Sequence, residues 1–318
     1  MVSNSFGRNE AQLRAELLSL WQGLLKSNDL TIDDDFFEAG GDSLLATEMS
    51  FQVEERLGIA IPDSLLFEAS TIAKLAEELS RVEDIERKVV YRVGGAAHLP
   101  ALFFYHGDWT NGGFYLADLA RSLGPELSLV AVAPHGMKGE EIPTSLQDMA
   151  ADRLPKILAL QPQGRFRLGG HCVGGMVAFE TARLLIASGH EVELVTMVDP
   201  IWTPGGRPWP TLPKPTETGN TPSQVLPNMK ATPESWERYG EALVNYTPSP
   251  LHVRTLVFSA FFDGRPWHQL SSKVSLVETP GGHYDLVTFR SPFFAEQVKQ
   301  QLRSQEAENG RRGDQWPR

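Results

Sequence analysis

Cysteine is almost absent from this 318-residue chain, and long apolar runs are missing from it altogether. Its one cysteine, Cys172, excludes an intramolecular disulfide framework and fits a reducing compartment. No stretch approaches the ~18 apolar residues that a membrane-spanning helix needs. Residues 1–8 hold no basic segment followed by an apolar one, so we expect no secretory signal. These absences together predict a cytoplasmic protein that does not enter a membrane.

A surplus of basic residues is also lacking. The formal net charge is −11, and residues 1–85, with 17 acidic and 6 basic side chains, account for all of it. This distribution argues against nucleic-acid binding, which relies on basic surfaces. It predicts instead an acidic N-terminal module that attracts basic partner surfaces.

Residues 8–82 have the apolar spacing of a small four-helix bundle. The expected helices cover residues 10–27, 43–56, 63–68 and 71–82. Residues 83–88 are polar and charged, so we predict a linker there. The three aspartates at 33–35 lack the later acidic ligands of an EF-hand loop, so we expect a solvated loop and no metal.

A specific motif lies between the first two of these helices, at residues 36–44 (FFEAGGDSL). It places Ser43 where a helix begins, and free N–H groups and the helix dipole favour an anion at that point. The alternative is that Ser43 or Asp42 is only an N-cap. The motif resembles the attachment site of phosphopantetheine carrier domains, and its Gly-Gly-Asp-Ser form is closest to peptidyl carrier proteins. The resemblance implies that a phosphopantetheinyl transferase attaches 4′-phosphopantetheine to Ser43.

From residue 89 onward, expected strands alternate with expected helices, which predicts an α/β fold with a mostly parallel sheet covered on both faces. The strands cover residues 89–93, 99–105, 127–133, 166–169, 192–198, 253–260 and 274–279, and the helices 114–123, 145–160, 176–185 and 293–302. Residues 304–318 are polar and aperiodic, so we expect a disordered tail.

The turn at residues 169–175 (GGHCVGG) links an expected strand to an expected helix. Strand, Gly-x-Cys-x-Gly turn and helix form the nucleophile elbow of α/β-hydrolases, with cysteine where serine is usual. Glycines two residues either side of the nucleophile let strand and helix approach closely. The alternative is that Cys172 is a buried core residue, because a free cysteine often packs as a small hydrophobe.

Two further side chains lie where such a nucleophile needs them, after strands and in the chain order nucleophile, acid, histidine. Asp199 follows one strand and His283 follows the last one. A histidine can accept the thiol proton, and a carboxylate on its other nitrogen orients it. Asp263, after the intervening strand, is a second candidate for the acid.

Residues 102–107 (LFFYHG), 197–200 (MVDP) and 281–283 (GGH), together with the elbow, resemble the type I thioesterase domains of non-ribosomal peptide and polyketide assembly lines. The resemblance covers residues 89–303. It implies that the acid is Asp199, and that a lid lies at about 203–250.

The oxyanion hole is expected to use the N–H of Val173 and a second donor from residues 106–109, for which Asp108 is our choice. His106 and Trp109 are candidates for the pocket wall or for simple packing.

The expected lid segment contains ten of the chain's 22 prolines. Only residues 234–245 have helical spacing, because prolines exclude a helix over 204–227. The aromatic residues in and beside the segment fit either a substrate wall or lid packing; they are Trp202, Trp209, Trp236 and Tyr239.

These features predict a carrier–thioesterase didomain in natural-product biosynthesis. An acyl or peptidyl chain, supplied by adenylation, condensation or other assembly-line enzymes, is held as a thioester on Ser43, passes to Cys172 and is released by hydrolysis, cyclisation or aminolysis. The alternatives are an acyltransferase that passes the chain to an external amine or alcohol, and a non-catalytic acyl shuttle with a degenerate hydrolase domain.

Overall fold

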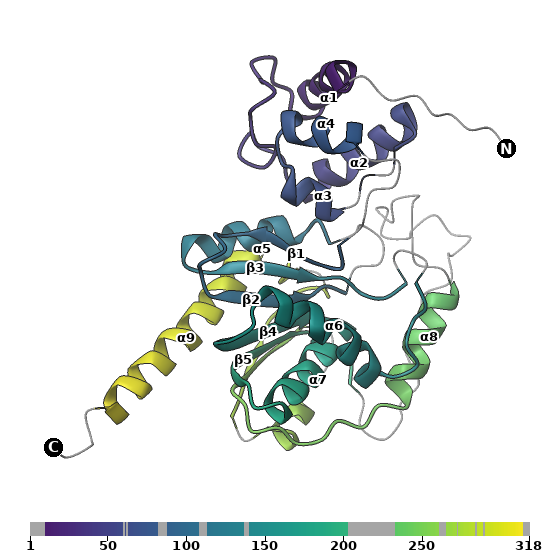
Figure 1. Ribbon diagram of the computed structural model, residues 1–318. Helices are drawn as coiled ribbons and strands as arrows, with labels where there is room; N and C mark the ends of the chain where they lie inside the picture. The colour runs from purple at the N-terminus through teal and green to yellow at the C-terminus, as the bar shows by residue number, and fades with distance from the viewer. Residues whose placement is uncertain are drawn as a thin grey trace.

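The chain is described by a computed structural model, which places residues 10–59, 61, 63–81, 88–107, 113–136, 140–202, 233–260, 265–271, 273–283, 285–288 and 290–313. A small helical unit from the N-terminal part lies beside a larger α/β unit (Figure 1). The predicted fold class, an α/β-hydrolase-type domain preceded by a small helical domain, is confirmed. The predicted linker lies outside the described residues apart from Lys88.

The N-terminal unit is built around a buried aromatic and aliphatic core. Its helices are α1 (Glu10–Leu25), α2 (Ser43–Leu57), α3 (Asp63–Glu68) and α4 (Ile72–Arg81). Trp21 and Phe36 are fully buried at its centre, with ring centroids 4.8 Å apart in an edge-on arrangement. Helix α2 ends at Gly58, whose φ of 63° is the left-handed conformation that glycine adopts without strain. The helices differ from the expected ranges only at their ends.

Asp34 and Asp35 anchor the loop between α1 and α2, and Asp35 also ties it to the rest of the bundle. Asp35 accepts hydrogen bonds from the backbone N–H of Phe37, at 2.9 Å, and from the hydroxyl of Ser70, while Asp34 accepts from Thr31. These carboxylates are therefore engaged as turn and loop anchors. Within the described ranges, no group of three or more histidine, cysteine or acidic side chains is placed to hold a metal ion.

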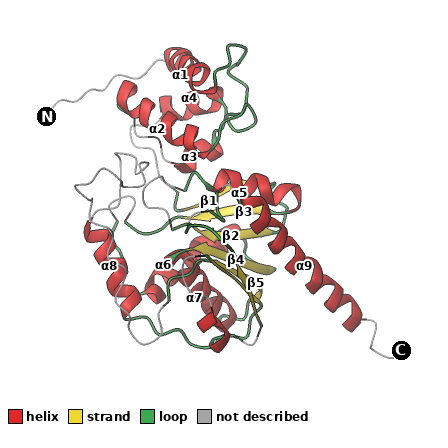
Figure 2. Cartoon of the chain, turned by 180° about the vertical axis from the view of Figure 1, so that it is seen from behind, coloured by secondary structure: helices red, strands yellow, loops and turns green. Residues whose placement is uncertain are grey.

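The α/β unit has one sheet in the order β1-β3-β2-β4-β5-β6-β7, with β1 antiparallel to β3 and the remaining pairs parallel. The strands are β1 (Val90–Gly94), β2 (Ala101–Tyr105), β3 (Ser128–Val132), β4 (Arg165–His171), β5 (Glu191–Val198), β6 (Thr255–Ser259) and β7 (Val274–Glu278). Central strands β2 and β3 are buried at every position, because helices cover both faces of the sheet (Figure 2).

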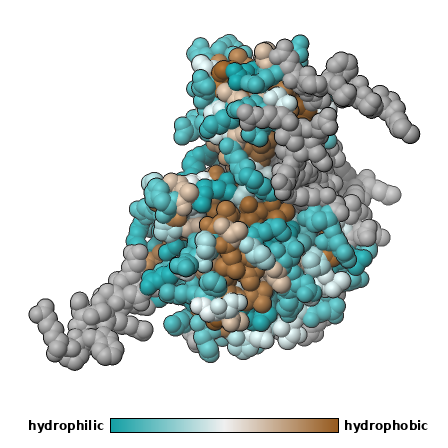
Figure 3. All heavy atoms as spheres, in the orientation of Figure 1, coloured by the Kyte–Doolittle hydropathy of each residue, from teal (hydrophilic) through white to brown (hydrophobic). Residues whose placement is uncertain are grey.

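Two layers of helices enclose this sheet. One face packs against α5 (Leu116–Leu123) and α9 (Ser291–Gly313), and the other against α6 (Leu146–Leu160) and α7 (Val173–Ala187). Helix α8 (Pro233–Val244) joins the α6–α7 layer and matches the one helix expected in the lid. On the face shown in Figure 3, apolar side chains gather in the middle of the α/β unit and hydrophilic ones surround them. Of the helices that the structure describes, none has the length and apolar character to cross a bilayer.

The C-terminal prediction differs from the structure. Helix α9 continues to Gly313, so residues 304–313 are helical rather than part of an irregular tail. The first part of α9 packs Phe294, Ala295 and Val298 against the sheet. The sequence of residues 304–313 has no apolar stripe, so the helical pattern could not reveal this part of the helix.

Candidate active site

Cys172 lies at the sharp turn between β4 and α7. Its backbone has φ 59° and ψ −128°, and its side chain is buried, with 5% exposure. A β-carbon on Gly170 would come within 2.3 Å of the Gly174 backbone, and one on Gly174 within 2.2 Å of the Tyr105 carbonyl oxygen. Only glycine fits at these two positions, so strand, turn and helix can cross as closely as the expected elbow requires.

The structure brings His283 and Asp199 together beside this turn. The His283 Nδ1 lies 2.5 Å from the Asp199 Oδ2, and His283 also has a side-chain hydrogen bond with Cys172. Asp199 is fully buried, and its other oxygen accepts from the backbone N–H of Ala260 at 3.1 Å. The three side chains expected to act together are thus neighbours in the fold. The competing acid, Asp263, lies outside the described residues.

The electrostatics of this group favour a protonated histidine. Burial by itself lowers the pKa of His283, but the hydrogen bonds and charges of Asp199 and Cys172 outweigh it and raise the pKa well above the usual 6.5.

The backbone of Asp199, like that of Cys172, has a positive φ, which is unusual for residues other than glycine; the value for Asp199 is 47°. Backbone conformations of this kind are found most often at functional sites, so their presence at two neighbouring strand ends agrees with the site expected at this edge of the sheet.

Sequence reasoning missed His171, the residue before Cys172. Its ring is completely buried, and its Nε2–H donates to the backbone carbonyl of His283 at 2.8 Å. Burial, together with the nearby positive charge of His283, lowers the pKa of His171 to about 3, so its ring is neutral. The two histidine rings are 4.4 Å apart between centroids. His171 therefore holds the loop that carries His283. In the sequence, its position within the elbow motif is the one signal that could have identified it.

Removing this bond should weaken the site without removing any reacting group. We expect His171→Ala to lower the single-turnover rate of acyl release about 10- to 100-fold, since His283 loses the contact that fixes its loop. The side-chain amide of His171→Gln still offers a donor, so this variant should recover part of the rate. Equal rates for both variants and for the protein without substitutions would show that the contact has no positioning role.

One of the two expected oxyanion donors can be placed. Val173 follows Cys172 and is the first residue of α7, so its N–H is at the positive end of the helix dipole. Gly107 passes close to the elbow, because a β-carbon there would lie 3.1 Å from the Cys172 Cβ. Asp108 and Trp109 fall outside the described residues, so their expected roles remain predictions. His106 is buried, with its ring 6.5 Å from that of Tyr115.

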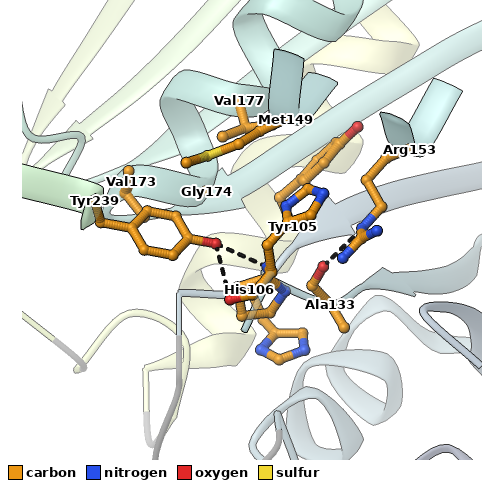
Figure 4. A pocket seen from close by; sticks show the side chains of 11 residues that line it. Tyr105, His106, Ala133, Met149, Arg153, Val173, Gly174, Val177 and Tyr239 are labelled. Atoms are coloured by element: carbon orange, nitrogen blue, oxygen red, sulfur yellow. Dashed lines mark hydrogen bonds between the residues drawn. The ribbon is translucent and has the colours of Figure 1, made fainter. Parts of the chain in front are cut away.

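A small pocket lies directly behind the elbow (Figure 4). It is lined by Tyr105, His106, Ala133, Pro134, His135, Met149, Arg153, Val173, Gly174, Val177 and Tyr239. Tyr239 reaches in from α8 and is almost fully buried; its hydroxyl oxygen accepts from the N–H of His135 at 2.7 Å. Tyr239 thus both lines the pocket and anchors α8.

The other expected lid aromatics are only partly placed. Trp202 is half-buried, with its ring centroid 5.3 Å from that of Trp267. Trp209 lies outside the described residues, and the side chain of Trp236 is not described.

A second anchor joins Tyr246, which follows α8, to α7. Glu180 of α7 is buried and accepts a 2.7 Å hydrogen bond from the hydroxyl of Tyr246, and Arg183 pairs with the same carboxylate. In Tyr246→Phe this buried carboxylate loses one donor. We expect the free energy of unfolding, measured in urea, to fall by about 1–3 kcal/mol. A change below about 0.5 kcal/mol would contradict this assignment.

Known families match both units of the chain. Residues 15–79 match the phosphopantetheine attachment site family, and residues 112–248 match the thioesterase domain family. Indigoidine synthase of Dickeya dadantii is 34% identical over 194 residues, which are 59% of this chain and 13% of that protein. A dimodular nonribosomal peptide synthase of Bacillus subtilis is 34% identical over 198 residues, 61% of this chain and 8% of that protein. The chain thus spans only a small part of the length of these relatives.

Solved structures share the fold. The holo form of a four-domain nonribosomal peptide synthetase aligns with 94% of this chain and 27% of its own, at 23% identity and a TM-score of 0.57. The type II thioesterase BorB from the borrelidin cluster aligns with 69% of this chain and 100% of its own, at 18% identity and a TM-score of 0.51. The chain therefore carries a phosphopantetheine carrier domain followed by a thioesterase domain of the α/β-hydrolase fold.

Proposed function

We propose that this chain holds an acyl or peptidyl thioester at Ser43, transfers the acyl group to Cys172 and releases it from there. The observation that carries the proposal is the placement of the chain's one thiol at the N-terminus of α7, hydrogen-bonded to a histidine that is itself paired with a buried aspartate. Cysteine stands where this fold usually has serine, so the assignment of the thiol rests on this geometry.

The environment of Ser43 suits the attached group. Ser43 is the first residue of α2, and the Asp42 side chain caps that helix by accepting from the Leu45 N–H at 2.8 Å. The remaining N–H groups of the first turn and the helix dipole favour a phosphodiester. Only glycine fits at position 41, because the β-carbon of any other residue would lie 2.4 Å from the Phe36 ring. The 4′-phosphopantetheine arm supplies a thiol on which the acyl chain is held as a thioester.

The site residues then have defined roles. His283 takes the proton of the Cys172 thiol, and the thiolate formed in this way is the attacking form of cysteine. The sulfur forms a new carbon–sulfur bond with the thioester carbonyl carbon, the old carbon–sulfur bond breaks, and His283 gives its proton to the departing thiolate, which leaves as a thiol. The N–H of Val173 stabilises the negative oxygen, and Asp199 keeps the imidazole oriented.

Release from Cys172 follows the same chemistry in reverse. A water, amine or alcohol attacks the acyl carbonyl while His283 takes its proton, and Cys172 leaves as a thiol. Because the acyl group stays a thioester throughout, it remains activated for a weak or sterically constrained acceptor. Hydrolysis, cyclisation and aminolysis are therefore all open to this site, as is transfer to an external acceptor.

We further propose that a phosphopantetheinyl transferase modifies Ser43 and that assembly-line enzymes with adenylation and condensation domains, acting in the cytoplasm, supply the chain. The support is the carrier domain and the matched portions of nonribosomal peptide synthetases.

Loading the carrier with an acyl-pantetheine from acyl-coenzyme A, and then following intact mass, tests the proposal. On the chain without substitutions, we expect the mass of the acyl group to appear and then to decay. The product found in solution identifies the acceptor as water, an amine or an alcohol. Ser43→Ala should acquire no acyl-pantetheine. A chain that keeps the acyl group on Ser43 indefinitely, with water and amines present, would favour the non-catalytic shuttle.

A further inference from the structure

The carrier motif touches the thioesterase domain at one turn of α5. The Ser43 hydroxyl donates to the Asp118 Oδ2 at 3.1 Å, and the Arg121 guanidinium donates to the Gly41 carbonyl at 3.3 Å. Asp118 and Arg121 also pair with each other at 2.9 Å. Both sides of this contact are polar, and the donor at its centre is the hydroxyl that the proposed modification would consume.

A second, mainly apolar contact lies nearby. Phe67 of α3 has its ring centroid 6.0 Å from that of Tyr91 on β1 and 5.9 Å from that of Phe114, just before α5. Lys88 pairs with Glu68 at 2.7 Å. Figure 1 shows α3 next to β1 and α5, in keeping with these contacts. Modification of Ser43 changes no atom of the apolar contact, so this contact is lost only if the whole carrier domain separates from α5, whereas the contact with Asp118 involves the modified hydroxyl itself.

Modification reverses the electrostatics at Asp118. The Ser43 Oγ forms a bond to phosphorus, the pyrophosphate bond of coenzyme A breaks, adenosine 3′,5′-bisphosphate leaves, and the hydroxyl proton is lost. The serine oxygen then has no proton to donate, and a negatively charged phosphodiester faces the carboxylate. Like charges a few ångströms apart repel, and a phosphodiester next to an acidic side chain disrupts a contact in this way.

We propose that Asp118 and Arg121 form a latch that holds the carrier domain against α5 only while Ser43 is unmodified. The latch rests on the proposed attachment at Ser43. In the latched state Ser43 is partly covered and engaged, so the transferase must compete with Asp118 for it. After modification the contact opens, and the carrier is free to visit the enzymes that load it.

The two-domain chain without pantetheine, a phosphopantetheinyl transferase and coenzyme A provide the test. Asp118→Ala should be modified several-fold faster than the unaltered chain. The matched control is Glu191→Ala, which removes an exposed acid whose partner is Arg165, away from the carrier. It should be modified at the unaltered rate.

Hydroxyl-radical footprinting of Tyr91 supplies a second readout. In the chain without substitutions, labelling of this buried ring should rise when pantetheine is attached to Ser43. In Asp118→Ala, labelling should already be high before pantetheine is attached. Equal modification rates for Asp118→Ala and the unaltered chain, or unchanged Tyr91 labelling on modification, would overturn the latch. A chain on which Ser43 accepts no pantetheine at all would instead refute the attachment site, so the two failures are distinguishable.

Discussion

Replacing Cys172 by alanine should reduce acyl release to the background rate, a loss of about a millionfold, as expected when the nucleophile of such a site is removed. The Cys172→Ala protein should still fold, because only one sulfur atom is lost from a packed position and the glycine-framed turn remains. The measurement is single-turnover release from the loaded carrier, followed by mass. Near-normal release in this variant would refute covalent catalysis by the thiol.

Cys172→Ser is the matched variant, because it retains a nucleophile of similar size. A serine ester is more stable than the thioester from which it forms, so loading becomes more favourable and onward transfer to a weak acceptor becomes slower. We expect a lower overall rate and more hydrolysis relative to transfer. An identical rate and product ratio would mean that cysteine confers nothing that serine lacks.

The second large effect concerns the acid. Asp199→Asn should lower the release rate by up to about ten-thousandfold, since the amide cannot stabilise the imidazolium or hold the same tautomer. Burial and the 2.5 Å contact with His283 are the reasons for this expectation. Because His283 owes its raised pKa partly to Asp199, the variant should also shift the pH dependence of release toward lower pH.

Asp263→Asn is the control that separates the two candidate acids. We expect it to keep near-normal release, because the described structure already gives His283 a carboxylate partner. A severe loss in Asp263→Asn with little loss in Asp199→Asn would reverse the assignment of the acid. Thermal unfolding of both variants distinguishes a chemical defect from a folding defect.

Much of the fold follows from the sequence because its signals are local. The apolar period of α1 and the alternation of strands with helices predict both units, and the glycines around Cys172 predict the elbow. A strand's direction in the sheet is not a local property, so the antiparallel position of β1 had no signal. The pairing of β1 with β3 becomes visible only when the chain is folded.

The site was partly predictable for the same reason. Cys172 and His283 stand in distinctive glycine contexts, and Asp199 ends a strand. His171 was missed because its role is a contact with a backbone carbonyl 112 residues away, which no spacing rule encodes. Asp118 and Arg121 likewise have the pattern of an ordinary exposed helical pair, and only the placement of α2 beside α5 gives them a partner.

The central claim is that the acyl group passes through Cys172, and locating that group on the chain tests it most directly. The carrier is loaded with a slowly released acyl chain, the reaction is quenched at short times, and peptides containing Ser43 and Cys172 are mapped by mass spectrometry. The account predicts that the acyl mass leaves the Ser43 peptide, appears on the Cys172 peptide and disappears as product forms. Product formation with the acyl group found only on Ser43, at every time point, would contradict it.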